Sequence, residues 1–240
     1  MDAKIHYAKN ATLVAIIMLA TAAPSIAHEA VILLHGLVRT ERSMTRMAQA
    51  LEDAGYAVTN VGYASRRANI EDLARNVISE ALRHPAITNA TKIHFVTHSL
   101  GGILVRQYLH ENKIDNLGRV VMLAPPNQGS EVVDTLGDRA FFQWMHGPSG
   151  NQLGTDINSV PNQLGPVDFE LGIIAGNRSI NWINSLTMIK GLDDGKVSIE
   201  HTKVAGMKDH ITIRATHPYI MRNRNAIRHT IHFLQTGRFK

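Results

Sequence analysis

The chain has 240 residues, of which 44% are hydrophobic and 19% are charged, a composition that is typical of a globular protein with a buried core and excludes an intrinsically disordered chain. The formal net charge is +5, but Lys and Arg are spread along the sequence without interleaved aromatic residues, so the charge pattern does not favour nucleic-acid binding. The absence of cysteine excludes disulfide bonds, thiol nucleophiles and thiolate metal sites.

The N-terminal segment has the pattern of a secretory signal peptide. Two lysines precede the apolar run ATLVAIIMLATAA at 11–23, and Ser25 and Ala27 are small residues at the two positions that signal peptidase reads. The alternative is a membrane anchor, but this run of 13 residues is shorter than the roughly 20 that span a bilayer. We therefore expect residues 1–27 to be removed on export, to a periplasm or out of the cell, and residues 28–240 to form the folded domain.

Short apolar runs alternate with segments of helical periodicity. Strands are expected at 30–34, 56–61, 93–97 and 119–123, with helices at 43–54, 70–82 and 100–110 between them, and further strands at 169–175 and 212–215 precede a final helix at 219–235. Continuous apolar runs rich in Val and Ile are typical of strands buried on both faces, as in parallel sheets. The alternation predicts an α/β fold, with a mostly parallel sheet and helices on both of its faces.

A long insertion follows the fourth predicted strand, from Asn127 to about Pro166, and it is rich in Gly, Asn, Gln and Pro. Connections of this length in compact domains are typically lids or binding loops. Because the segment contains the apolar cluster AFFQWM at 140–145, we expect a small cap in which Phe142 and Trp144 line the substrate site. The alternative is a surface loop whose aromatic side chains pack onto the core.

The stretch FVTHSLGG at 95–102 joins the third predicted strand to the helix after it. Ser99 therefore lies at the carboxyl end of a buried strand, where parallel sheets carry their sites. A serine in a tight strand-to-helix turn presents its hydroxyl as a nucleophile, and Gly101 and Gly102 give the chain room for that turn. A lone serine before a helix more often caps the helix, but the order strand, serine, glycine and helix favours the nucleophile. His98 is interpreted as a neighbour that lines the substrate pocket.

A serine nucleophile needs N–H donors for the oxyanion, a base, and a carboxylate that orients the base. The stretch LLHGL at 33–37 ends the first predicted strand. We expect the backbone N–H groups of Leu37 and Leu100 to form the oxyanion hole. His35 is expected to shape this turn as a structural histidine rather than to react.

The carboxylate and the base are sought late in the chain. Asp193 and Asp194 lie in the Gly-rich turn GLDDGKV, and Asp194 is favoured because it directly precedes a glycine, although either residue could be a turn former. Of the 13 histidines, His217 is favoured as the base because it lies in the loop between the last strand and the last helix. His210 precedes that strand and so falls at the opposite end of the sheet.

These stretches together resemble the α/β-hydrolase family, in its serine esterase and lipase branch. The matching stretches are HGL at 35–37, THSLGG at 97–102, APPNQGS at 124–130, DDGKV at 193–197 and THP at 216–218. The family's turn is usually G-x-S-x-G, and Thr97 stands at its first position in this chain. The resemblance implies hydrolysis of a small-molecule or lipid ester through an acyl-enzyme, with Ser99, Asp194 and His217 as the triad and without a cofactor.

Two other functions remain open from the residues. An acyltransferase with the same triad would pass the acyl group to an alcohol instead of water, and a non-catalytic binding protein would keep the fold without the chemistry. His94 and His98 are four residues apart but lie in a strand and turn rather than on one helix, so no metal site is expected. The positive net charge is compatible with transient contact with a membrane surface or lipid, and the oligomeric state is left open.

Overall fold

The computed structural model describes residues 28–136, 140–179 and 192–240, without the side chains of 136 and 140–145. Within these residues, six strands form one sheet in the order β2-β1-β3-β4-β5-β6, and every neighbouring pair is parallel. The strands are β1 (Glu29–Leu34), β2 (Ala57–Val61), β3 (Lys92–His98), β4 (Leu117–Leu123), β5 (Leu171–Gly176) and β6 (Asp209–Ile213). This confirms the predicted α/β fold with a parallel sheet. The expected strand at 212–215 is β6, which begins earlier because its pairing with β5 starts at Asp209.

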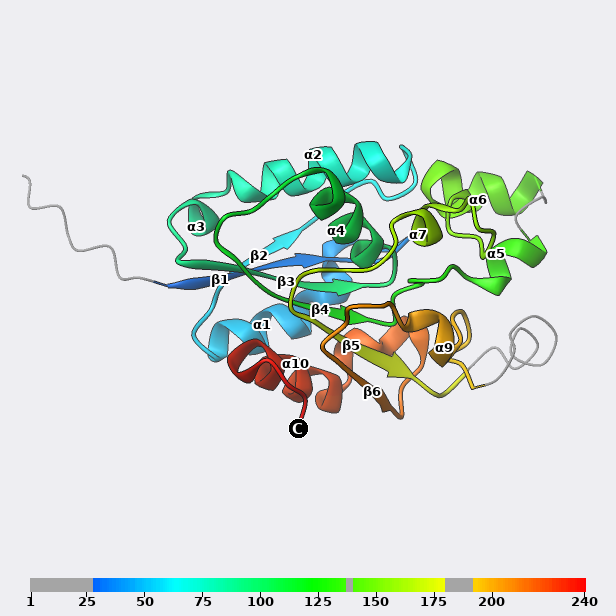
Figure 1. Ribbon diagram of the computed structural model, residues 1–240. Helices are drawn as coiled ribbons and strands as arrows, with labels where there is room; N and C mark the ends of the chain where they lie inside the picture. The colour runs from blue at the N-terminus through cyan, green and yellow to red at the C-terminus, as the bar shows by residue number, and fades with distance from the viewer. Residues whose placement is uncertain (1–27, 137–139, 180–191) are drawn as a thin grey trace, which may run out of the picture.

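Helices cover both faces of the sheet (Figure 1). On one face lie α2 (Ile70–Leu82), α3 (Pro85–Thr88) and α4 (Leu100–Glu111), and on the other lie η1 (Glu41–Met44), α1 (Thr45–Asp53), η2 (His217–Arg222) and α10 (Arg224–Thr236). Along β1, Ala30, Ile32 and Leu34 pack against the first layer, whereas Val31 and Leu33 pack against the second. All five are fully buried, which explains why the strand reads as a continuous apolar run.

The final helix is divided differently from the expectation. The segment expected as one helix at 219–235 consists of the 3-10 turn η2 followed by α10. Asn223 separates them: its backbone is extended, and its side-chain oxygen accepts hydrogen bonds from the N–H groups of Asn225 and Ala226. Asn223 is therefore the N-cap of α10, and a new helix starts there, whereas the spacing of apolar residues alone indicates one continuous helix.

The insertion after β4 is more helical than its composition indicates. It contains α5 (Glu131–Leu136), α6 (Ala140–Asn151) and α7 (Val160–Gln163), which gather beyond the carboxyl ends of the strands (Figure 1). The α6 segment is kinked at Gly147, which has a φ of 67°. A side chain at this position would collide with the backbone carbonyl of Arg66, so glycine is needed for both the conformation and the close approach.

Arg106, on α4, holds the two ends of the insertion together. Its guanidinium donates hydrogen bonds to the backbone and side-chain oxygens of Asn127, at 3.0 and 3.2 Å, and to the carbonyl of Gly165, at 2.7 Å. The side chain is 3% exposed, and burial lowers its pKa to about 10. The helix that follows Ser99 therefore fixes where the insertion leaves the sheet and where it returns.

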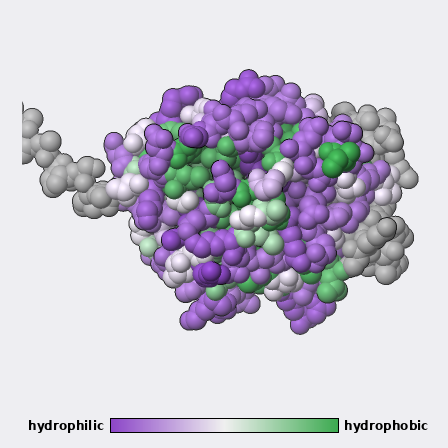
Figure 2. Space-filling view, viewed as in Figure 1, coloured by the Kyte–Doolittle hydropathy of each residue, from purple (hydrophilic) through white to green (hydrophobic). Residues whose placement is uncertain are grey.

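The face shown in Figure 2 is mostly hydrophilic, and its apolar residues form smaller, separate patches. In the described ranges no helix has both the length and the apolar character needed to cross a membrane. Those ranges also contain no group of three His, Asp or Glu residues placed to hold a metal ion. The predicted signal peptide at 1–27 lies outside the described residues.

Candidate active site

The site lies where the chain reverses its direction across the sheet. After β1 the chain moves to β2 on one side, and it then returns to place β3 on the other side of β1. The loops that follow β1 and β3 therefore diverge and leave a crevice at the carboxyl ends of these strands, where α/β sheets bind ligands. Leu34 and Thr97 are paired across β1 and β3, so the chain stretches that carry Leu37 and Ser99 begin side by side.

Ser99 sits in a strained turn between β3 and α4. Its φ and ψ are 52° and −122°, a conformation that residues other than glycine rarely adopt. Its side chain makes no capping hydrogen bond to the helix, so the capping alternative does not describe it. A Cβ on Gly101 would lie 2.7 Å from the carbonyl oxygen of Leu34, so the tight turn requires glycine there. Thr97, in place of the usual glycine, is accommodated as a fully buried residue of β3.

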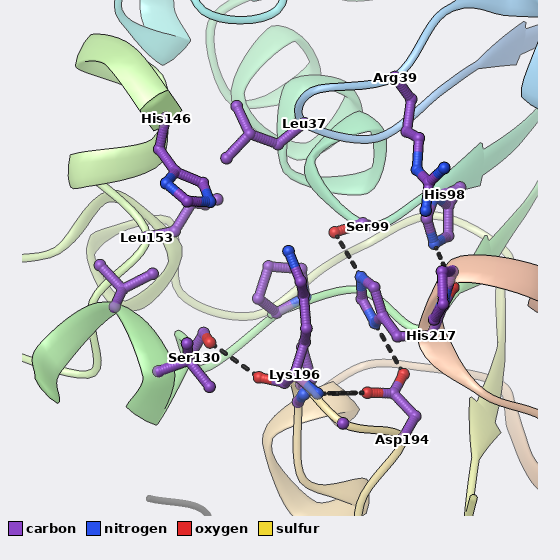
Figure 3. A pocket seen from close by; sticks show the side chains of 16 residues that line it. Leu37, Arg39, His98, Ser99, Ser130, His146, Leu153, Asp194, Lys196 and His217 are labelled. Carbon is purple, nitrogen blue, oxygen red and sulfur yellow. Dashed lines mark hydrogen bonds and ion pairs between the residues drawn. The ribbon is translucent and has the colours of Figure 1, made fainter. Parts of the chain in front are cut away.

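Ser99, His217 and Asp194 form a continuous series of hydrogen bonds (Figure 3). The Nδ1 atom of His217 lies 2.7 Å from Oδ2 of Asp194, and its Nε2 atom lies 3.1 Å from Oγ of Ser99. Because a carboxylate only accepts, Nδ1 carries the proton and Nε2 is left to accept the serine proton. Asp194 and His217 are 1% and 5% exposed, so the ion pair that forms when His217 is protonated is shielded from water.

The two neighbouring aspartates have different surroundings. Oδ1 of Asp194 accepts hydrogen bonds from the N–H groups of Lys196 and Val197, at 3.1 and 3.0 Å, which leaves Oδ2 for His217. The His217 N–H also donates to the backbone carbonyl of Asp194 at 2.9 Å. Asp193 instead accepts from the N–H of Gly195 at 2.6 Å and closes the turn. The structure therefore brings Asp194 to the histidine and gives Asp193 the role of a turn former.

The two residues expected to supply the oxyanion donors, Leu37 and Leu100, both lie near Ser99. Leu100 directly follows it, and a Cβ on Gly36 would lie 3.1 Å from Cβ of Ser99, which places the Gly36–Leu37 turn against the serine. His35 holds this turn: its Nδ1 donates to the carbonyl of Gly36 at 2.9 Å, and its Nε2 accepts from the N–H of Tyr63 at 3.3 Å. The Tyr63 ring stacks on His35 at 4.0 Å, and burial lowers the pKa of His35. His35 is thus a neutral structural residue.

His98 lies in the wall of the pocket, and both of its ring nitrogens are directed at the protein. Its Nε2 donates to the backbone carbonyl of His217 at 3.0 Å, and its other nitrogen is buried below Gly36. The side chain is 2% exposed, and burial holds its pKa well below the usual value for histidine. Its contact therefore positions the His217 loop, which the sequence interpretation as a pocket-lining neighbour did not anticipate.

We expect His98→Phe to lower kcat about tenfold with little change in KM, because loss of the donor frees the His217 loop and small displacements of a catalytic base are costly. The conservative variant His98→Gln keeps an N–H donor and should recover part of the loss. Steady-state kinetics on one ester checks both variants. A rise in KM at unchanged kcat would instead favour a direct substrate contact.

Next to Ser99 the described residues enclose a pocket of about 240 Å³. Its apolar wall is formed by the loop after β1 and by the insertion, through Leu37, Val132, Val133 and Leu153. Figure 3 shows Leu37, Leu153 and His146 on the side of the pocket opposite Asp194. The side chains of Phe142 and Trp144, predicted to line the substrate site, lie outside the described residues.

Three pocket residues were not anticipated from the sequence. Ser130 ends the APPNQGS stretch, and its hydroxyl donates to the Lys196 carbonyl at 2.8 Å, which ties the start of the insertion to the Asp194 turn. Lys196 and Arg39 bring cationic groups to the pocket. Lys196 lies inside the DDGKV stretch and Arg39 lies two residues after HGL, so membership of those motifs or proximity to them was the available signal.

The architecture is an α/β-hydrolase fold with a nucleophile-type turn at the carboxyl end of its third strand. The sequence pattern described as "Alpha/beta hydrolase family" matches residues 31–180, and the chain belongs to this family. A search of curated proteins gives no match.

Solved structures with the same fold are similar to this chain at low sequence identity. A lipase from Bacillus licheniformis in its mature form has a TM-score of 0.71 and 18% identity, over 89% of this chain and 94% of that chain. A metagenomic carboxyl esterase has a TM-score of 0.62 and 21% identity, over 82% and 68%. Phospholipase PlaB from Legionella pneumophila, in complex with thio-NAD, has a TM-score of 0.58 and 20% identity, over 73% and 44%.

Proposed function

We propose that the protein is a serine hydrolase that cleaves carboxylic esters through an acyl-enzyme. The observation that carries this proposal is the hydrogen-bonded series of Ser99, His217 and Asp194, at 3.1 and 2.7 Å, at the mouth of a largely apolar pocket. The names of the similar structures, a lipase, a carboxyl esterase and a phospholipase, support ester bonds as the substrate class.

In the proposed reaction, Oγ of Ser99 attacks the ester carbonyl while Nε2 of His217 takes its proton. Asp194 stabilises the imidazolium that forms and holds its tautomer. The N–H groups of Leu37 and Leu100 stabilise the tetrahedral oxyanion. His217 then returns the proton to the leaving alcohol, and an acyl group remains on Ser99. A water molecule, activated in the same way, releases the carboxylic acid and restores the serine.

An acyltransferase would form the same acyl-enzyme in its first half-reaction. In the second half-reaction a hydrolase passes the acyl group to water, whereas an acyltransferase passes it to an alcohol.

The N-terminal pattern supports export, so we propose that the enzyme acts in a periplasm or outside the cell. A small-molecule or lipid ester is the proposed partner in either compartment.

The proposal is tested by hydrolysis of a p-nitrophenyl ester series from acetate to palmitate, with and without an added alcohol. A pocket of about 240 Å³ is small for a ligand site, so we expect kcat/KM to peak at short acyl chains such as butyrate. Release of free acid as the main product supports a hydrolase, whereas transfer to the added alcohol at the expense of acid supports an acyltransferase. Absence of turnover across the series would contradict both.

A further inference from the structure

Two cationic side chains reach the pocket from opposite sides of Ser99. Figure 3 shows Arg39 coming from the loop after β1 and Lys196 coming from the Asp194 turn. Neither side chain forms an ion pair with any residue that the structure describes. Asp194 is the single carboxylate among the described lining residues, and its oxygens are already taken by His217 and two backbone N–H groups. The described lining residues therefore include two cations, Arg39 and Lys196, and one carboxylate, which leaves an excess of positive charge.

Lys196 is held so that its side chain enters the pocket. Its backbone N–H donates to Oδ1 of Asp194 at 3.1 Å, and its carbonyl accepts the hydroxyl of Ser130 at 2.8 Å. With both backbone groups bound, the direction in which the side chain leaves the backbone is fixed toward the pocket that it lines. The residue as a whole keeps exposed surface, but the protein around its ammonium group desolvates that group enough to lower its pKa.

Arg39 is likewise placed by a constrained turn. Val38 has a φ of 58°, a left-handed conformation that is a genuine outlier for a β-branched residue. The turn is held by a hydrogen bond from the Val38 N–H to Oγ of Ser65, at 3.1 Å, and by one from the Arg39 N–H to the carbonyl of Gly36, at 3.2 Å. Strain of this kind persists where the surrounding contacts maintain a functional geometry.

The two cations are close enough to affect each other. Partial burial lowers the pKa of Lys196, and the positive charge of Arg39 lowers it further, while Asp194 opposes the shift. Both cations also act on His98, at the back of the site. Two like charges beside an apolar wall repel each other, and an anion placed between them would relieve the repulsion and gain charge-assisted hydrogen bonds.

We propose that Arg39 and Lys196 form an anion-binding subsite, and that the substrate is an ester whose alcohol part carries a carboxylate or phosphate group. This inference rests on the proposed function of the same site. The apolar wall of Leu37, Val132 and Leu153 suits the acyl chain, so the charged group belongs to the other half of the ester. An anionic lipid headgroup and a small soluble anion share this chemistry.

The test compares two matched pairs of substrates. The first is 4-butanoyloxybenzoate, which is anionic, against the neutral 4-butanoyloxybenzamide. The second is dihexanoyl phosphatidylglycerol against zwitterionic dihexanoyl phosphatidylcholine, both below their critical micelle concentrations. We expect the wild type to prefer the anionic member of at least one pair, and Arg39→Gln and Lys196→Gln each to reduce that preference by about tenfold, mainly through KM, because paired charges contribute strongly when partly desolvated.

Arg83→Gln and Lys113→Gln are the matched controls, since they remove the same charges from exposed positions near the amino ends of the strands. They should leave the preference unchanged. Loss of preference in the benzoate pair alone indicates a soluble ester, and loss in the phospholipid pair indicates a lipid headgroup.

Three outcomes would overturn the inference. An unchanged preference in both pairs leaves the cations without a role in selectivity, even if the neutral esters are still hydrolysed and the proposed function stands. An equal fall in kcat for the neutral and anionic substrates means that the cations stabilise the oxyanion rather than bind a substrate anion. Failure of the wild type to hydrolyse any of the four esters removes the proposed function together with this inference.

Discussion

Ser99→Ala should lower kcat for ester hydrolysis by about 10⁴-fold or more, because the residual rate then depends on binding and oxyanion donors without a nucleophile. The folded structure should be retained. The serine hydroxyl contacts His217 and makes no capping bond to α4, and alanine meets the same backbone strain at this position as serine does. The rate on p-nitrophenyl butyrate and the melting temperature of both proteins check the two parts of this expectation.

A fluorophosphonate probe provides an independent measurement for the same variant. It should label the wild-type protein and leave Ser99→Ala unlabelled, because the probe reacts with an activated serine. Ser149 is a useful comparison, since it is buried and its hydroxyl is bound to the Ser65 carbonyl, and Ser149→Ala should retain labelling. Turnover by Ser99→Ala above a few per cent of the wild-type rate would show that another residue is the nucleophile.

Asp194→Asn should reduce kcat by about 10⁴-fold, while Asp193→Asn should stay within a few-fold of the wild type. In Asp194→Asn the amide oxygen is needed by the N–H groups of Lys196 and Val197, so the amide nitrogen must face Nδ1 of His217. An N–H donor there requires Nδ1 to accept, which moves the histidine proton to Nε2. That tautomer cannot take the proton from Ser99.

Asp193→Asn is the matched control, because it makes the same change of charge one residue away and keeps an oxygen for the Gly195 N–H. Comparable losses in the two variants would mean that the shape or charge of the turn, rather than the tautomer of His217, controls the rate. A larger loss in Asp193→Asn would move the carboxylate assignment to that residue. Steady-state kinetics on p-nitrophenyl butyrate separates these results.

The fold was accessible from the sequence because its signals are local. Successive apolar residues of β1 face the two helix layers alternately, and the helix at 70–82 has a complete apolar face, so both elements can be recognised without knowledge of their neighbours. The last helix was less accessible. The segment is divided at Asn223, whose side chain caps α10 by accepting hydrogen bonds from the N–H groups of Asn225 and Ala226. These bonds form only after the 3-10 turn η2 has placed Asn223.

The helical content of the insertion was underestimated for a related reason. Its composition resembles a loop, yet the segment is held by contacts with distant parts of the chain, such as the bonds from Arg106 to Asn127 and Gly165. Gly147 is required where α6 passes the backbone of Arg66. Tertiary contacts of this kind override local propensity.

The sequence by itself determined the fold class, the strand-to-helix turn at Ser99, and a short list of acids and bases in the right chain order. Only the tertiary structure showed that Asp194 and not Asp193 contacts the His217 ring, gave His98 its contact with the His217 loop, and brought Arg39 and Lys196 to one pocket. The physical reason is the range of the interactions involved. Periodicity and turn chemistry act between residues that are close in the chain. The hydrogen bonds of His217 to Ser99 and to His98 join residues 118 and 119 positions apart, and they exist only after the sheet has placed its loops together.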